Sequence, residues 1–215
     1  MTDDFQAVEA KRVAFAREMK KYIAAGNRYL DPAPALDYEH LQGCEILPDR
    51  FEILKRLPRH GRVAEVGVDR GDFSVRILET AMPSELKLID IDTGRISAEN
   101  RPIIEASGVA QIMQGDSSTT IAELEDESFD WIYIDGDHRY DGVKKDIEAA
   151  AGKVKENGLL VFNDYTVWSP TSMFHCGVAR AVNEFCRSDG WRMVYLCFQS
   201  MFYNDVAITR IGTKP

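Results

Sequence analysis

Residues 63–73 read VAEVGVDRGDF, and this stretch decides the fold class. A short apolar run ends at Gly67, and an amphipathic stretch begins just after Gly71. Glycine lets the chain turn tightly and lets a ligand approach the backbone. A helix that follows such a turn presents unpaired N–H groups to a polar or anionic ligand. The stretch therefore predicts a strand, a glycine turn and a helix, with a binding loop at the turn.

The spacing of these glycines argues against a dinucleotide. Dinucleotide-binding loops read GxGxxG, whereas three residues separate Gly67 from Gly71, and Asp69 stands where a middle glycine would. The Asp69 carboxylate would repel a pyrophosphate, so we expect a zwitterionic or neutral ligand and disfavour a nicotinamide oxidoreductase. A glycine turn without any ligand is the alternative that this loop alone leaves open.

Strand-like and amphipathic segments alternate from this loop onward. Apolar runs lie at 63–68, 86–91, 111–115, 129–135 and 158–164, and helical stretches lie at 73–81, 96–108, 118–125 and 143–154. This alternation predicts an α/β fold of the doubly wound kind, with a parallel sheet covered by helices on both faces. A helix at 177–187 and two strands at 191–198 and 201–211, joined by a short turn, add an antiparallel hairpin at the end.

The N-terminal part follows a different pattern. A helix is expected over the first 25 residues, a proline-containing loop over 31–48 and a short helix over 49–57. We therefore predict a helical cap segment at 1–58 and a single domain at 59–215. The first helix is amphipathic and could pack on its own domain or on a second copy, so a homodimer stays open.

Composition excludes several functional classes. The 215 residues include 26 Lys and Arg against 35 Asp and Glu, for a net charge of -9, which argues against binding duplex nucleic acid. No run approaches the roughly 18–20 apolar residues that span a bilayer, so no membrane association is expected. The four cysteines form no CxxC pair and no secretory segment is evident, which predicts a cytoplasmic protein with free thiols.

Acidic residues follow the second and third strands. Asp90 comes 19 residues after Gly71, close to the offset of a carboxylate that accepts ribose hydroxyls. Asp92 is expected to be a loop or cap residue. Asp116 and Ser117 follow the third strand, where they could accept from an adenine amine or cap a helix. The pairing of Asp90 with the glycine loop favours a ligand of the nucleoside type.

A second acidic group follows the fourth and fifth strands. Asp135, Asp137 and His138 end the fourth strand, and Asn163 and Asp164 end the fifth. Ligands of open α/β sheets lie at the carboxyl ends of the strands, so these side chains could converge there. Two carboxylates and an amide oxygen suit Mg²⁺ or a similar hard cation. The alternative is a set of ordinary loop and cap residues.

The segments VAEVGVDRGDFS, LIDID, QGDSS, FDWIYIDGDHRYDGV and GLLVFNDY together resemble the class I S-adenosylmethionine-dependent methyltransferases. More narrowly, they resemble the metal-dependent small-molecule O-methyltransferases that include macrocin O-methyltransferase and cephalosporin-hydroxylase-like proteins. The resemblance covers roughly residues 60–210 and implies a Rossmann-like, mostly parallel seven-stranded sheet whose last strand is antiparallel. It does not account for residues 1–58.

The resemblance also implies roles for individual residues. The metal would be held by Asp135, Asn163 and Asp164, although relatives often carry two acids where this chain has Asn163 and Asp164. Asp137 or His138 would take the acceptor's proton beside Asp135. The loop and strand ends together give the expected cofactor-binding set: Glu65, Gly67, Asp69, Gly71, Phe73, Asp90, Asp116, Ser117 and Asp135.

The predicted function is methyl transfer from S-adenosylmethionine to a hydroxyl group of a small molecule, assisted by Mg²⁺ or a similar divalent cation. Two alternatives stay open. A metal-independent methyltransferase would be indifferent to a chelator, and a catalytically silent protein would bind the cofactor without transferring its methyl group. The acceptor has no recognisable code in the sequence.

Overall fold

The computed structural model describes residues 3–28, 30–171 and 173–213. The chain forms two compact units, residues 1–32 and residues 33–215. The first unit contains the helix α1 (Asp3–Ala24), where a helix was predicted. The division at residue 32 differs from the predicted boundary at residue 58. Residues 33–58 belong to the larger unit because they supply a strand and a helix that pack into it.

The larger unit is built on an eight-stranded sheet in the order β1-β9-β10-β6-β5-β2-β3-β4. β10 runs antiparallel to both of its neighbours, and every other neighbouring pair in this sheet is parallel. The strands span Glu45–Leu47 (β1), Arg62–Val66 (β2), Glu85–Asp90 (β3), Ala110–Gln114 (β4), Phe129–Ile134 (β5), Val154–Phe162 (β6), Trp191–Phe198 (β9) and Asn204–Arg210 (β10). The seven predicted strands are confirmed, and β1 adds an eighth where a loop was expected.

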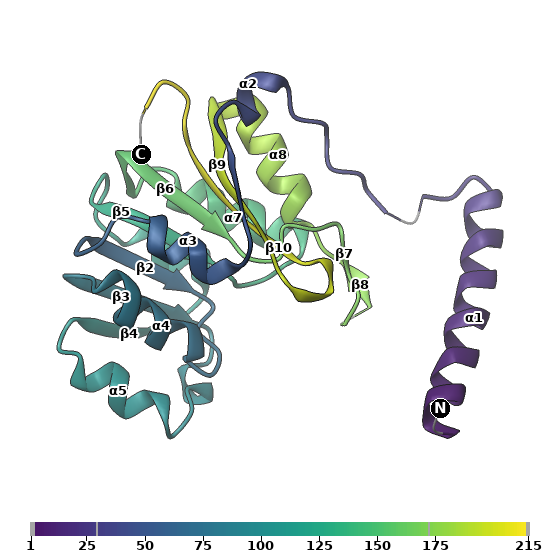
Figure 1. The fold of residues 1–215 in the computed structure, drawn as a ribbon, viewed down its shortest axis with the longest axis horizontal. Helices are drawn as coiled ribbons and strands as arrows, with labels where there is room; N and C mark the ends of the chain where they lie inside the picture. The colour runs from purple at the N-terminus through teal and green to yellow at the C-terminus, as the bar shows by residue number, and fades with distance from the viewer. Residues whose placement is uncertain (1–2, 29, 172, 214–215) are drawn as a thin grey trace. The chain divides into compact units, whose positions relative to one another are not determined.

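Helices cover both faces of this sheet (Figure 1). One apolar core lies under α3, α4 and α5, and a second lies under α6, α7 and α8. Their bounds are Arg50–Arg56 (α3), Asp72–Ala81 (α4), Asn100–Ala106 (α5), Ser117–Ala122 (α6), Tyr140–Ala150 (α7) and Val178–Asp189 (α8). Alternate residues of β5 enter the two cores, with Trp131 and Tyr133 on one side and Ile132 and Ile134 on the other. The fold is therefore Rossmann-like and doubly wound, as predicted.

The remaining elements are short. They are α2 (Tyr38–Leu41), β7 (Trp168–Ser169) and β8 (Phe174–His175), which pair with each other, and the 3₁₀ turns Thr93–Arg95 and Ser200–Phe202. The helix predicted over 143–154 ends at Ala150, and Val154 instead starts β6, where it pairs with Phe129. The four cysteines are unpaired. Within the described part of the chain, no helix combines the length and apolarity needed to cross a bilayer.

The strand order positions a site at one edge of the sheet. The chain proceeds from β2 outward through β3 and β4, then returns to the other side of β2 with β5 and β6. Val66, the last residue of β2, pairs with Ile89 on one side and Ile134 on the other. The carboxyl ends of β2, β3 and β5 therefore meet at the point where the winding reverses, and this is where open α/β sheets bind ligands.

Candidate active site

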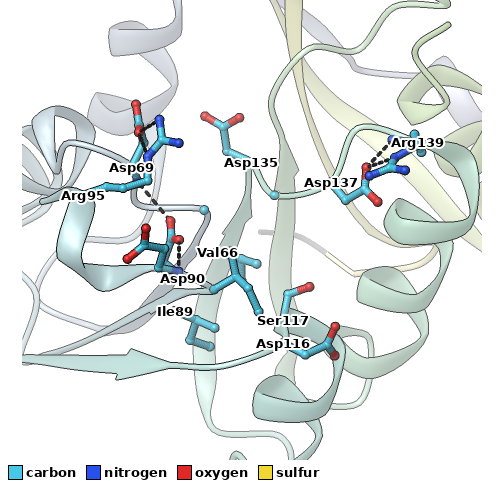
Figure 2. A pocket seen from close by; sticks show the side chains of 14 residues that line it. Val66, Asp69, Ile89, Asp90, Arg95, Asp116, Ser117, Asp135, Asp137 and Arg139 are labelled. Atoms are coloured by element: carbon cyan, nitrogen blue, oxygen red, sulfur yellow. Dashed lines mark hydrogen bonds and ion pairs between the residues drawn. The ribbon is translucent and has the colours of Figure 1, made fainter.

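A pocket of about 580 Å³ opens at this reversal point. Its lining is strongly acidic, with six Asp and two Arg among the fourteen residues that form it. Figure 2 shows Asp69 and Arg95 on one side, Asp137 and Arg139 on the other, and Asp135 between them. A surface of this charge attracts a cationic ligand and repels a diphosphate. The pocket therefore agrees with the argument made from Asp69 in the sequence.

Gly67 lines the pocket and lies directly against the backbone that follows β5. Its φ is +86°, and a Cβ placed there would lie 2.0 Å from the carbonyl oxygen of Asp135. The Asp135 N–H donates to the Val66 carbonyl at 2.7 Å. Any side chain at position 67 would collide with backbone, which is why this turn requires glycine. The close approach brings the loop after β2 and the loop after β5 into one wall.

Asp90 holds the glycine loop from the end of β3. One carboxylate oxygen accepts from the N–H groups of Val68 (2.7 Å) and Asp69 (2.9 Å), and the other accepts from Asp92 (2.8 Å). Asp92 in turn caps the short 3₁₀ turn that follows, as expected for a cap residue. Asp90 thus has the predicted place at the pocket wall, and it also fixes the conformation of the loop beside it.

Asp116 and Ser117 line the pocket after β4. Asp116 is the N-cap of α6, accepting from the Thr119 N–H at 3.0 Å, so the helix-cap interpretation is confirmed. This bond and those from the Ser118 and Thr119 hydroxyls lower the pKa of Asp116. The Ser117 hydroxyl points to a different partner, donating to Asp146 of α7. The lining position of both residues leaves an adenine contact open to them.

Three predicted cofactor residues do not line the pocket. Glu65 is 1 % exposed and accepts a hydrogen bond from the Ser74 hydroxyl, and burial raises its pKa to about 8. Gly71 is the N-cap of α4 with a φ of +81°. Phe73 packs against the ring of Tyr133, with the ring centroids 4.3 Å apart. These three residues therefore belong to the packing around the pocket and not to its lining.

The structure brings together the side chains at the ends of β5 and β6. The Asn163 amide donates to Asp135 Oδ1 at 2.8 Å, and His138 Nε2 lies 3.2 Å from the same oxygen. Burial lowers the pKa of His138, but the Asp135 carboxylate more than offsets this, so the net shift is upward. Burial raises the pKa of the nearby Asp164. Asp137 is bound instead by the backbone and side chain of Arg139.

Sequence reasoning missed a second layer of polar residues behind Asp135. Arg50 of α3 donates to the hydroxyl of Tyr133, and that hydroxyl donates to Asp205 of β10 at 2.7 Å. Asp205 is fully buried, which raises its pKa to about 6 against the opposing effect of Arg50. One signal was available, because Asp205 is a charged residue inside an apolar strand pattern. No signal in the sequence pointed to Arg50.

The residues present do not fit the predicted magnesium site. Each Asp135 oxygen already faces nitrogen: Oδ1 faces Asn163 and His138, and Oδ2 lies 3.6 Å from the Arg50 guanidinium. Asn163 turns its amide nitrogen, which cannot bind a cation, toward Asp135. No group of three or more His, Cys, Asp or Glu in the described ranges could hold a metal ion. A site made of Asp135, Asn163 and Asp164 is therefore not supported.

Comparison with known proteins identifies the part of the chain that carries this pocket. Residues 64–165 match a methyltransferase domain. The methyltransferase match begins within β2, extends past the end of β6 and includes every residue that lines the pocket. No curated protein matches the chain. The match concerns residues 64–165 alone, and it does not extend to the narrower macrocin O-methyltransferase group.

Solved structures share the fold at low sequence identity. A protein from Corynebacterium glutamicum aligns over 99% of both chains with 14% identity and a TM-score of 0.57. Precorrin-6y C5,15-methyltransferase from Geobacter metallireducens covers 74% of this chain and 84% of its own, with 13% identity and a TM-score of 0.54. Spermidine synthase from Thermotoga maritima covers 74% of this chain and 59% of its own, with 16% identity and a TM-score of 0.52. Likeness at this level shows the methyltransferase fold alone.

Proposed function

We propose that this protein transfers a methyl group from S-adenosylmethionine to a hydroxyl group of a small molecule. The single observation that carries the proposal is the acidic pocket at the point where the winding of the sheet reverses. Gly67, after β2, and Asp90, at the end of β3, both line this pocket. The methyltransferase domain match supports the methyl-transfer part of the proposal.

The residues of the pocket fit this methyl donor. S-adenosylmethionine, when bound, supplies a methyl group on a positively charged sulfur, and carboxylates favour such a charge. The turn at Gly67 lets the methionine part approach the backbone. In this proposal Asp90 accepts the ribose hydroxyls and Asp116 with Ser117 contacts the adenine, and the lining of the pocket by all three residues supports these roles. A volume of about 580 Å³ falls in the usual range for small-molecule sites.

Alignment is the main contribution of the protein to such a reaction, because methyl transfer requires the acceptor oxygen in line with the departing sulfur.

In this proposal His138 accepts the proton that the acceptor hydroxyl loses. Its imidazole lies 3.2 Å from Asp135, whose carboxylate stabilises the charged ring that results. Asp137 is a weaker candidate, because its Oδ1 already accepts two hydrogen bonds from Arg139.

Calorimetric titration with S-adenosylhomocysteine tests the binding half of the proposal. We expect one site per chain, and Asp90→Asn is expected to weaken binding at least about tenfold, since it removes a charged acceptor worth roughly 1.5–3 kcal/mol. Asp126→Asn is the matched control, because that carboxylate only pairs with Lys153 at the surface. Absence of binding, or equal affinities for both variants, would contradict the proposal.

Transfer of a labelled methyl group to a panel of small alcohols, phenols and sugars tests the catalytic half. We expect His138→Ala to lower the transfer rate by about 10²–10⁴-fold while the affinity for S-adenosylhomocysteine changes little. Binding without transfer to any acceptor would favour the catalytically silent alternative.

A further inference from the structure

Six polar side chains form a closed ring that includes Asp135 of the pocket wall. Arg50 donates to Tyr133, Tyr133 donates to Asp205, and Gln199 donates to both Asp205 and Asn163. Asn163 donates to Asp135, whose other oxygen lies 3.6 Å from Arg50 and completes the ring. We call this group the Arg50 ring; its members are Arg50, Tyr133, Asp205, Gln199, Asn163 and Asp135.

Arg50 is fixed in place from two directions. It is the first residue of α3, whose N-cap Asp49 accepts from the N–H groups of Phe51 and Glu52 at 2.8 and 3.1 Å. Its guanidinium carbon lies 4.2 Å from the centroid of the Phe73 ring, a cation–π geometry. The Arg50 side chain is 22% exposed. The guanidinium is therefore held at one position rather than free in solvent.

The Arg50 guanidinium lies close to two carboxylates and serves both as their positive partner. Two of its nitrogens each lie 3.6 Å from a carboxylate oxygen, one on Asp135 and one on the buried Asp205. Guanidinium does not lose its proton in proteins, so this charge is permanent. A divalent ion bound to Asp135 would face a positive charge within a few ångströms, in surroundings where burial reduces screening.

We propose that the Arg50 guanidinium is a positioning group that replaces a divalent cation at the ends of β5 and β6, so that the active site works without a metal. The inference rests on the proposed function and adds a residue from outside the matched range 64–165. Arg50 orients Asp135, which lines the cofactor pocket and contacts His138. Its role is to hold that carboxylate in place while Asp135 stabilises the charged imidazole.

Titration with Mn²⁺, followed by the electron paramagnetic resonance signal of the free ion, tests the proposal without requiring an acceptor. We expect no saturable site in the wild-type protein. Arg50→Gln removes the charge and should create one saturable Mn²⁺ site, at least about tenfold tighter than the residual Mn²⁺ binding of the wild-type protein. The double variant Arg50→Gln/Asp135→Asn should lose that site again. Arg56→Gln is the control, since this arginine of the same helix pairs with Glu45 at the surface.

Two results would overturn the proposal. One is a saturable Mn²⁺ site in the wild-type protein that Asp135→Asn abolishes, and the other is a folded Arg50→Gln variant with no Mn²⁺ site. If circular dichroism shows that Arg50→Gln does not fold, Mn²⁺ titrations of the wild-type protein and of Asp135→Asn still decide whether Asp135 binds a divalent cation. Titration of the same samples with S-adenosylhomocysteine tests the proposed function separately. If S-adenosylhomocysteine does not bind, the proposed function fails, but the Mn²⁺ titration still tests the role of Arg50.

Discussion

The hydroxyl of Ser117 donates a hydrogen bond to one carboxylate oxygen of Asp146 at 2.6 Å and so joins α6 to α7 beside the acidic pocket. Asp146 is 1 % exposed, and its other oxygen has no hydrogen-bond partner. Burial raises the pKa of Asp146 to about 6, and the Ser117 bond opposes that rise. Among the described residues, the Ser117 hydroxyl is therefore the one hydrogen-bond partner of this buried carboxylate.

Ser117→Ala is expected to lower the free energy of unfolding by about 1–3 kcal/mol at pH 7.5, because it leaves a buried carboxylate without a partner. Urea-induced unfolding measures the change. Ser118→Ala is the matched control, since the Ser118 hydroxyl only contacts the exposed Asp116. Equal effects of the two substitutions would contradict the role given to the Ser117–Asp146 bond.

The buried Glu65 predicts a pH dependence of stability. Its pKa is raised from 4.5 to about 8, so the folded state binds the Glu65 proton more tightly than the unfolded state. The resulting stabilisation is complete below pH 4.5 and is lost as the pH rises through about 8. Glu65→Gln keeps the shape of the side chain but cannot ionise. The free energy of unfolding of the variant minus that of the wild type should therefore be a few kcal/mol larger at pH 9 than at pH 5.

Thermal unfolding of both proteins between pH 5 and pH 9 measures this difference. Asp146 and Asp205 also have raised pKa values, and they affect the wild type and the variant alike. Glu123→Gln, at an exposed position, should follow the wild-type curve. Parallel curves for the wild type and Glu65→Gln would show that Glu65 is ionised in the folded protein.

Gly67→Ala tests the close approach between the loops after β2 and β5. The added methyl group would lie 2.0 Å from the Asp135 carbonyl oxygen at a φ of +86°. We expect destabilisation of at least about 3 kcal/mol and loss of S-adenosylhomocysteine binding. Gly152→Ala should stay within about 1 kcal/mol of the wild type, because open space surrounds that position. Similar stabilities for both variants would refute the steric argument.

Two truncations test the boundary between the compact units. Removal of residues 1–32 is expected to leave the Tm of the sheet within a few degrees, because this segment forms a separate compact unit. Removal of residues 1–58 should prevent stable folding, since it deletes β1 and exposes the surface that Ile53, Leu54 and Leu57 cover. A soluble, cooperatively unfolding 59–215 fragment would instead support the boundary predicted from the sequence.

The alternation of apolar runs and amphipathic stretches after residue 62 was enough to predict the doubly wound sheet and its antiparallel end. Buried strands and one-sided helices leave periodic traces in the sequence, and Gly67 marks a turn that only a small residue allows. Local pattern also placed Asp90, Asp116 and Asp135 at the carboxyl ends of strands. The strand β1 was missed because three residues between a glycine and a proline carry no periodic signal.

The tertiary structure alone decided how charges are shared at the end of β5. Asp135 and Asp164 are the carboxylates that suggested a metal, yet Arg50, 85 positions before Asp135 in the chain, lies beside one of them. Sequence spacing encodes which residues leave a strand at the same edge, but it does not encode which side chain from a distant helix meets them. That meeting depends on the packing of α3 against the sheet, and packing is a property of the folded chain as a whole.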